Sequence, residues 1–161
     1  MPDRTLIFSV FIVASCGLAY ELIAGALASY LLGDSILQFS TIIGCYLFAM
    51  GIGSHLSKYV PEERVLDRFI EVELLVGLIG GVSAALLFVL FAWLSMPFRT
   101  ILYVLVMMIG ILVGMEIPLV MRLLHQRKTE FSELISRVLT FDYLGALAVS
   151  LLFPQIGRAH V

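Results

Sequence analysis

Charged side chains are scarce in this sequence, and long stretches lack them altogether. Asp, Glu, Lys and Arg make up 14% of the 161 residues. None of them occurs in residues 35–57 or in the 24 residues 74–97, while residues 5–33 and 100–121 hold one each. A helix of about 20 apolar residues crosses the hydrocarbon core of a bilayer, which is roughly 30 Å thick. The scarcity of charge therefore predicts several membrane-spanning helices.

Recognisable patterns for metal binding, redox chemistry or catalysis are also absent. The cysteines, Cys16 and Cys45, lie in different apolar runs without a CxxC pair or a Cys/His cluster, so they are interpreted as small buried thiols. No Ser/His/Asp set, HExxH or Walker motif occurs. The net charge of −2, without a basic stripe, argues against a nucleic-acid partner. The sequence therefore predicts no catalytic, metal or cofactor residue in this chain.

Apolar residues, by contrast, are abundant. They make up 61% of the chain, against about 45–50% in soluble domains, and the mean hydropathy is +1.06. The first apolar run exceeds the roughly 7–15 residues of a signal-peptide core, so it is interpreted as a retained span. The predicted fold is all-α, a polytopic transmembrane helix bundle within residues 1–155. It has about five spans, with the fifth truncated, at residues 5–32, 36–57, 72–96, 100–122 and 140–154.

The connecting segments predict turns and an orientation. Gly33-Asp34-Ser35 predicts a tight hairpin between the first two spans, and Pro97 marks the turn between the third and fourth. Eight Lys and Arg residues lie in the N-terminus and in the loops 58–71 and 122–139, whereas the opposite turns hold only Arg99. Because basic loops stay in the cytoplasm, the N-terminus is predicted to lie inside a bacterial inner membrane.

Both basic loops are predicted to contain helix. Pro61, followed by Glu62 and Glu63, fits a first helical turn. In the second loop Thr129 fits an N-cap. We expect this segment to lie on the inner membrane surface and run into the fifth span, as a linker helix packed on its neighbours rather than a lipid sensor or a partner-binding helix. Its apolar stripe consists of Phe131, Leu134, Ile135, Val138 and Leu139.

Glu21 is the deepest acid, about sixteen residues into the first span and a little past mid-bilayer. A charge at the centre of a membrane helix costs at least about 2.5–3.5 kcal/mol, so Glu21 must be protonated, paired or in contact with a wet cavity. Gly17, Gly25 and Ala28 share its face and would let another helix approach closely, and Tyr20 could supply a hydroxyl. A cation site or a proton-carrying group is favoured over a protonated acid hydrogen-bonded between helices.

Glu116 lies near the inner end of the fourth span, two residues before Pro118. Pro118 has no N–H, so the carbonyl of Gly114 loses its helical hydrogen bond. A kinked helix with a free carbonyl beside an acid suits cation coordination. A purely local kink, with Glu116 paired to a base such as Arg122, is an equally weighted alternative.

The remaining acids lie nearer the interface. Asp142 is placed at the cytoplasmic entrance of the fifth span, where capping or pairing is the favoured role. Glu71 and Glu73, at the start of the third span, are expected to be solvated. The candidate intramembrane functional acids, with their supporting residues, are therefore Glu21, Glu116 and Asp142, with Tyr20 and Pro118.

Small residues recur at helical spacing and predict close helix contacts. GxxxG patterns occur in residues 77–81 and 110–114. The second span offers a stripe made of Ser40, Gly44, Gly51 and Ser54. No strand precedes these glycines, so they are not phosphate loops.

Five short motifs occur in an order that resembles one family. They are Tyr20-Glu21-Leu22, Gly33-Asp34-Ser35, Gly51-Ile52-Gly53-Ser54, Glu116-Ile117-Pro118 and Asp142-Tyr143-Leu144-Gly145-Ala146. The set, within residues 10–154, resembles the membrane-spanning N-terminal region of bacterial membrane-bound spermidine synthases, which are polyamine aminopropyltransferases.

The resemblance implies a longer protein. In that family a soluble Rossmann-like domain follows the membrane helices and moves an aminopropyl group from decarboxylated S-adenosylmethionine to putrescine, giving spermidine. Its glycine-rich nucleoside-binding motif and catalytic aspartates are absent here, so no catalytic residue is carried over and this chain alone is not expected to be an enzyme. Asp142 belongs to the membrane motif. The implied partners are the lipid bilayer, the C-terminal aminopropyltransferase domain, a polyamine ligand and a second copy of the chain.

The last six residues depart from the pattern. Residues 156–161 match one reading frame of a common sequencing adapter, ATC GGA AGA GCA CAC GTC, which predicts a non-native tail after residue 155.

Two other functions stay open. One is a stand-alone transporter or channel-like bundle for a cationic solute, and the other is a pure membrane anchor without a ligand.

Overall fold

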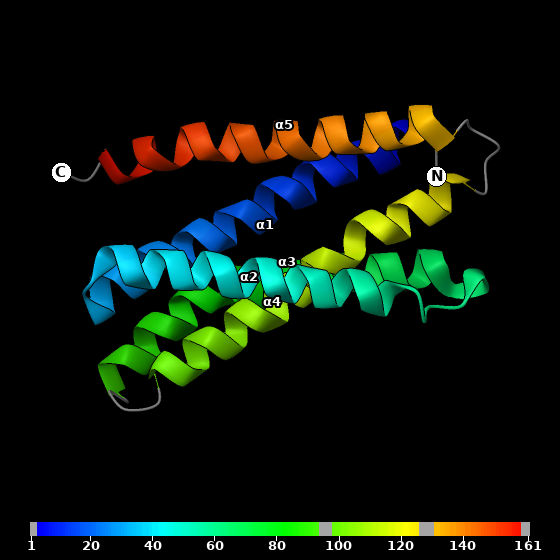
Figure 1. Cartoon of the computed structure of the whole chain (residues 1–161). Coiled ribbons are helices and arrows are strands. Elements are labelled where there is room, and N and C mark those ends of the chain that lie inside the picture. Colours follow the sequence, from blue (N-terminus) through cyan, green and yellow to red (C-terminus); the bar gives the residue numbers. More distant parts are fainter. Residues whose placement is uncertain (1–2, 94–97, 126–130, 159–161) are drawn as a thin grey trace.

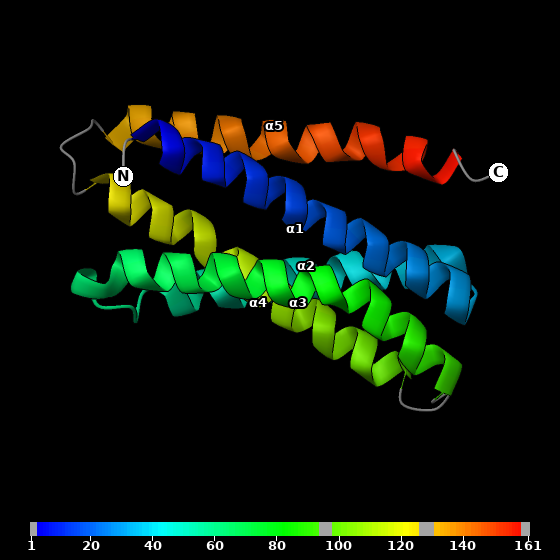
Figure 2. The ribbon, with the colours of Figure 1, turned by 180° about the vertical axis from the view of Figure 1, so that it is seen from behind.

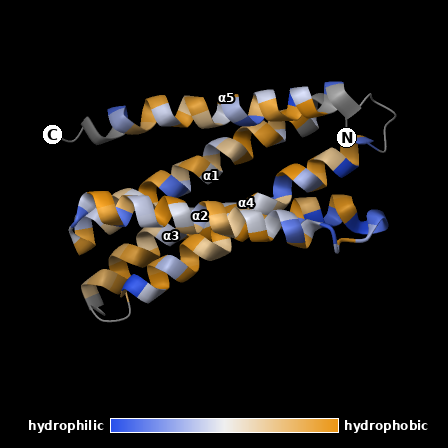
Figure 3. Ribbon diagram, in the orientation of Figure 1, coloured by the Kyte–Doolittle hydropathy of each residue, from blue (hydrophilic) through white to orange (hydrophobic). Residues whose placement is uncertain are grey.

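The computed structural model describes residues 3–93, 98–125 and 131–158, and these form five long helices. Each helix contains a stretch long and apolar enough to cross a membrane, which confirms the predicted all-α bundle with five spans. Figure 3 shows apolar residues along all five. The helices are α1 (Asp3–Leu32), α2 (Ser35–Ser57), α3 (Val65–Trp93), α4 (Phe98–His125) and α5 (Phe131–Arg158), with the short 3-10 helix η1 (Glu62–Arg64) before α3.

The connection between α1 and α2 is the predicted hairpin. Only Gly33 and Asp34 separate the two helices, and both have positive φ, 72° and 46°. The left-handed conformation suits Gly, which has no Cβ, and Asp tolerates it better than most residues. The Asp34 carboxylate also accepts a hydrogen bond from the Leu37 backbone N–H at 3.4 Å, so it caps α2. The predicted turn at Pro97 lies outside the described residues.

Helix α3 begins earlier than predicted. We expected a loop helix followed by a span from residue 72, but η1 leads directly into α3 at Val65. Pro61 precedes η1 in an extended conformation, and Glu62 and Glu63 occupy its first turn, as predicted. No proline interrupts the chain between Pro61 and the end of α3, so the loop helix and the span form one continuous rod.

Helix α5 is also longer than predicted. The expected surface segment and the short span at 140–154 form a single helix from Phe131 to Arg158, within which Ile135–Gln155 is long and apolar enough to cross a membrane. Pro154 lies inside the helix. The Thr129 cap lies outside the described residues. On the predicted stripe Val138 is fully buried, so the segment packs on the bundle, in agreement with the linker interpretation.

The tightest helix contact joins α2 to α4 through glycines. A Cβ on Gly110 would lie 2.9 Å from the Tyr46 carbonyl oxygen, and one on Gly114 would lie 2.5 Å from the Met50 Cα. A Cβ on Gly53 would overlap the Ile111 carbonyl oxygen. The GxxxG pattern at 110–114 therefore marks a close helix contact, as predicted.

Two other predicted small-residue stripes make no close helix contact. Gly44 and Gly51 of α2 have open space around them, and so do Gly77 and Gly81 of α3. On both helices, other residues face the interior of the bundle. On α3 the inward glycine is Gly80, and on α2 the buried face consists of Gln38, Ile42, Tyr46, Ala49, Gly53 and Ser57.

Helix α1 lies between the α2–α4 pair and α5. Figures 1 and 2 show α5 beside α1 at the N-terminal end of the bundle, with the two helices diverging towards the other end. Their close contact is at Gly145, where a Cβ would lie 2.5 Å from the Phe11 carbonyl oxygen. At the same end Arg122 donates hydrogen bonds to the carbonyl oxygens of Ser57 (3.0 Å) and Val60 (2.9 Å), which joins α4 to the end of α2.

Candidate functional site

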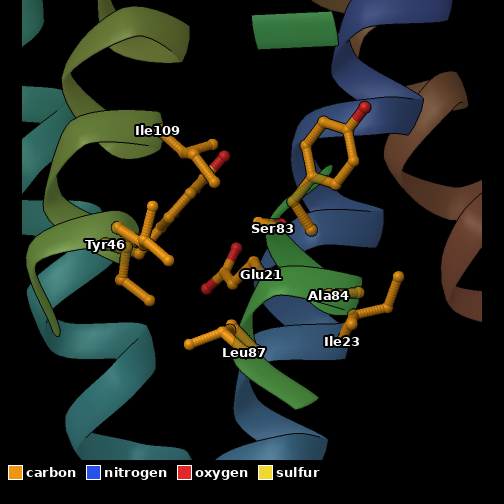
Figure 4. Close-up of a pocket in the computed structure, with 11 residues that line it drawn as sticks. Glu21, Ile23, Tyr46, Ser83, Ala84, Leu87 and Ile109 are labelled. Atoms are coloured by element: carbon orange, nitrogen blue, oxygen red, sulfur yellow. The ribbon is translucent and has the colours of Figure 1, made fainter. Parts of the chain in front are cut away.

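Glu21 lines a small pocket near the middle of α1. Its side chain is only 9% exposed. Figure 4 shows it pointing from α1 into the space between Tyr46, Ile109 and Leu87, which come from α2, α4 and α3. The pocket has room for about one water molecule. Such a space fits a hydrogen-bonded or proton-carrying acid and is too small for an organic cation.

The predicted close approach around Glu21 is confirmed. A Cβ on Gly17 would lie 3.2 Å from both the Tyr46 hydroxyl oxygen and a Val113 methyl carbon. A Cβ on Gly25 would lie 2.8 Å from the Phe39 ring, and Ala28 is fully buried. The supporting residue Tyr20 packs its ring against Gly80 of α3 and also lines the pocket.

Tyr46 connects this pocket to the second group of acids. The residue is 3% exposed, and its hydroxyl donates a hydrogen bond to the Gly17 carbonyl oxygen at 3.1 Å. It also lies within Coulombic range of Glu21, Glu116 and Asp142. A tyrosine in an apolar span gave no distinct sequence signal, so its central position was not predicted.

Replacing Tyr46 with Phe removes the hydroxyl and keeps the ring. Interhelical hydrogen bonds in membrane proteins contribute about 0.6 kcal/mol on average and up to about 1.7 kcal/mol. We expect Tyr46→Phe to lower the free energy of unfolding by about 1 kcal/mol, measured by SDS titration in mixed micelles. Tyr103→Phe is the matched control, because the Tyr103 hydroxyl donates to the Gln38 Oε1 over a longer 3.4 Å. A loss for Tyr103→Phe equal to that for Tyr46→Phe would contradict the assignment.

Glu116 is the most deeply buried acid of the described chain. The residue is 2% exposed, and its Oε1 has no hydrogen-bond partner among the described residues. The alternative pairing with Arg122 is not formed, because that guanidinium binds the end of α2. Helix α4 continues through Pro118, which has no N–H to donate to the Gly114 carbonyl oxygen. Glu116 is therefore a buried carboxyl group that forms no ion pair with a described residue.

Two further acids lie around Glu116. Its side chain is within Coulombic range of Glu73 from α3 and Asp142 from α5. Asp142 is half-buried, and it shares a helix face with the buried Val138 and Gly145. It lies within α5, which starts at Phe131.

Glu73 corrects an expectation. It was predicted to be solvated, but its Oε1 is buried without a hydrogen-bond partner among the described residues, and Ser9 of α1 hydrogen-bonds to its carboxylate. Glu71, two residues earlier, is exposed and pairs with Arg68 at 2.6 Å, as a solvated residue should. The difference arises because α1 covers one face of α3 and leaves the other open.

An open groove of about 300 Å³ runs between α1 and α3 beside Glu73. Its other walls are mainly aliphatic and include Ile12, Val13, Ile70 and Leu74, and Cys16 also lines it. Cys16 is in turn within Coulombic range of Glu116. No group of three metal-ligating side chains gathers in the described part of the chain, so these acids do not form a metal centre there.

Comparisons with known proteins identify relatives of the whole chain. Polyamine aminopropyltransferase 2 of Ralstonia nicotianae is 74% identical over 154 residues, which cover 96% of this chain and 30% of that protein. The polyamine aminopropyltransferase of Leptospira interrogans is 54% identical over 152 residues, covering 94% of this chain and 30% of the relative. Polyamine aminopropyltransferase 1 of Streptomyces coelicolor is 42% identical over 150 residues, covering 92% of this chain and 28% of the relative.

No protein-family model and no solved structure matches the chain. The match to the curated relatives confirms the resemblance in the five sequence motifs. The chain spans about 30% of the length of the first relatives, so most of each relative lies outside the match. The chain is therefore homologous to the N-terminal, membrane-helix part of the polyamine aminopropyltransferases.

Proposed function

We propose that this chain is the membrane-embedded N-terminal part of a polyamine aminopropyltransferase. The observation that carries the proposal is 74% identity over 96% of the chain to a relative of that name. The whole protein would transfer an aminopropyl group from decarboxylated S-adenosylmethionine, its co-substrate, to putrescine and so form spermidine. The residues for that chemistry would lie in the part of the protein beyond this match, because the described helices hold no catalytic constellation.

The chain would place the enzyme in the bacterial inner membrane with its basic loops in the cytoplasm. Arg122 and Lys58 lie at the N-terminal end of the bundle, and Arg99 lies at the other end. This distribution favours an N-terminus inside, because basic flanks stay in the cytoplasm.

Glu21, Glu116 and Asp142 are proposed as functional acids of the membrane part, supported by Tyr20 and Pro118. Burial and mutual proximity support this, since intramembrane acids that face a bundle interior commonly mark a ligand or proton pathway. The small size of its pocket supports a hydrogen-bonded or proton-carrying role for Glu21. Residues 156–161 are proposed to be a non-native tail.

The activity is tested by expressing the complete gene in a bacterial host that lacks spermidine synthase. Membranes are incubated with putrescine and labelled decarboxylated S-adenosylmethionine, and labelled spermidine is separated by chromatography. We expect product from the complete protein and none from the 161-residue chain expressed to the same level. A complete protein that modifies no amine acceptor, or a 161-residue chain that forms spermidine alone, would overturn the proposal.

A further inference from the structure

The groove between α1 and α3 combines two features that rarely occur together in a membrane-spanning region. One is an open volume of about 300 Å³ with mostly aliphatic walls. The other is a carboxylate on its lining, Glu73, with a buried oxygen that has no hydrogen-bond partner among the described residues. A buried acceptor without a donor costs free energy, so a partner is expected in the functional state.

A second acid, Glu116, is electrostatically coupled to Glu73 but does not line the groove. Glu116 is 2% exposed, has an unpartnered Oε1, and is within Coulombic range of Glu73. Cys16 also lines the groove. The lining thus offers one carboxyl group and an otherwise largely aliphatic surface.

The residues that line the groove favour one class of cation over others. A divalent metal is disfavoured because no three metal-ligating side chains come together in the described helices. A quaternary ammonium ion is disfavoured because none of the groove's lining residues is aromatic. A primary ammonium group can donate three hydrogen bonds to carboxylate oxygens, and an attached alkyl chain can bury its methylene groups against Ile12, Ile70 and Leu74.

We propose that the α1–α3 groove is a binding site for a linear aliphatic amine, with an ammonium group at Glu73 and the alkyl chain along the apolar wall. The inference rests on the proposed function only for the choice of putrescine and spermidine as probes. Binding is measured on the membrane helices without any transfer reaction, so its failure and the failure of aminopropyl transfer are separate results.

The test is equilibrium binding of labelled putrescine and spermidine to the 161-residue chain. The chain is held in phosphatidylcholine nanodiscs, because zwitterionic lipid does not itself attract amines. We expect saturable binding that excess unlabelled amine displaces and that 1,4-butanediol, which has the same alkyl length without the charge, does not displace. Glu73→Gln should weaken binding at least tenfold, whereas Glu71→Gln, on the exposed face of the same helix, should leave it unchanged.

A second pair of variants tests the groove without altering either acid. Gly77 lines the groove and has open space where a Cβ would lie, so Gly77→Phe should fill the groove and abolish binding while the bundle still folds. Gly81, one turn further along α3, also has open space but does not line the groove, so Gly81→Phe should bind like the parent chain. Absence of saturable binding to the parent chain would overturn the proposal. Equal binding by Glu73→Gln and Glu71→Gln, or by the two Phe variants, would also overturn it.

Discussion

Gly114→Leu is expected to prevent the chain from folding, and Gly114→Ala to destabilise it. A Cβ at this position would lie 2.5 Å from the Met50 Cα and 2.6 Å from the Met50 carbonyl carbon. These are backbone atoms of α2, so they cannot rotate away as a side chain could. One extra methyl group in such a contact costs about 1–3 kcal/mol, and the larger Leu side chain would force α2 and α4 apart.

The measurement is unfolding by SDS titration in mixed micelles, monitored by circular dichroism. Gly51→Ala is the matched control, because Gly51 lies on the exposed face of α2 with nothing near its missing Cβ. That control should be neutral or more stable by up to about 1 kcal/mol, since Ala favours helix over Gly. Equal stability of Gly114→Ala and Gly51→Ala would contradict the α2–α4 packing.

Opposite labelling of the two ends of the bundle is the second large effect we expect. With Cys16 and Cys45 replaced by Ala, single cysteines are introduced at Ser35, the first residue of α2, and at Glu63, in η1. Both positions are exposed. If the basic end lies in the cytoplasm, a membrane-impermeant maleimide should label Ser35→Cys nearly completely in spheroplasts and leave Glu63→Cys unlabelled.

Lysis of the spheroplasts is the control for this experiment. Glu63→Cys should become fully labelled once the cytoplasmic face is open, which shows that its thiol is reactive. Labelling of Glu63→Cys before lysis, with Ser35→Cys protected, would reverse the orientation and contradict the proposed cytoplasmic location of the basic loops.

The existence of the helices could be predicted because charge-free runs leave a helix as the structure that satisfies its own backbone in lipid. For α2 and α3, the side of the helix that faces a neighbour could not be predicted from the sequence. Gly51 and Gly53 lie two residues apart on α2, which is about 200° around a helix, yet only Gly53 faces α4. When a helix is apolar all round, small residues mark candidate contacts without indicating which side meets a neighbour.

The surroundings of the acids were likewise predictable only in part. The small residues packed around Glu21 were predictable from spacing along one helix. Glu73 was missed because a glutamate at a predicted span boundary has the sequence signature of a solvated residue, and only the packing of α1 over α3 buries it. The pairing of Glu116 with Arg122 failed for a related reason. The free carbonyls at the end of α2 are nearer partners for that guanidinium.

The central claim is that these helices are the membrane part of a polyamine aminopropyltransferase, and the gene itself tests it most directly. The measurement is the sequence of unamplified genomic DNA across codon 155 and onwards. We expect the genomic reading frame to lack the six adapter-like codons after residue 155. It should instead continue into a glycine-rich soluble domain. A stop codon directly after Val161, with the same six codons present, would contradict the account and favour a small stand-alone membrane protein.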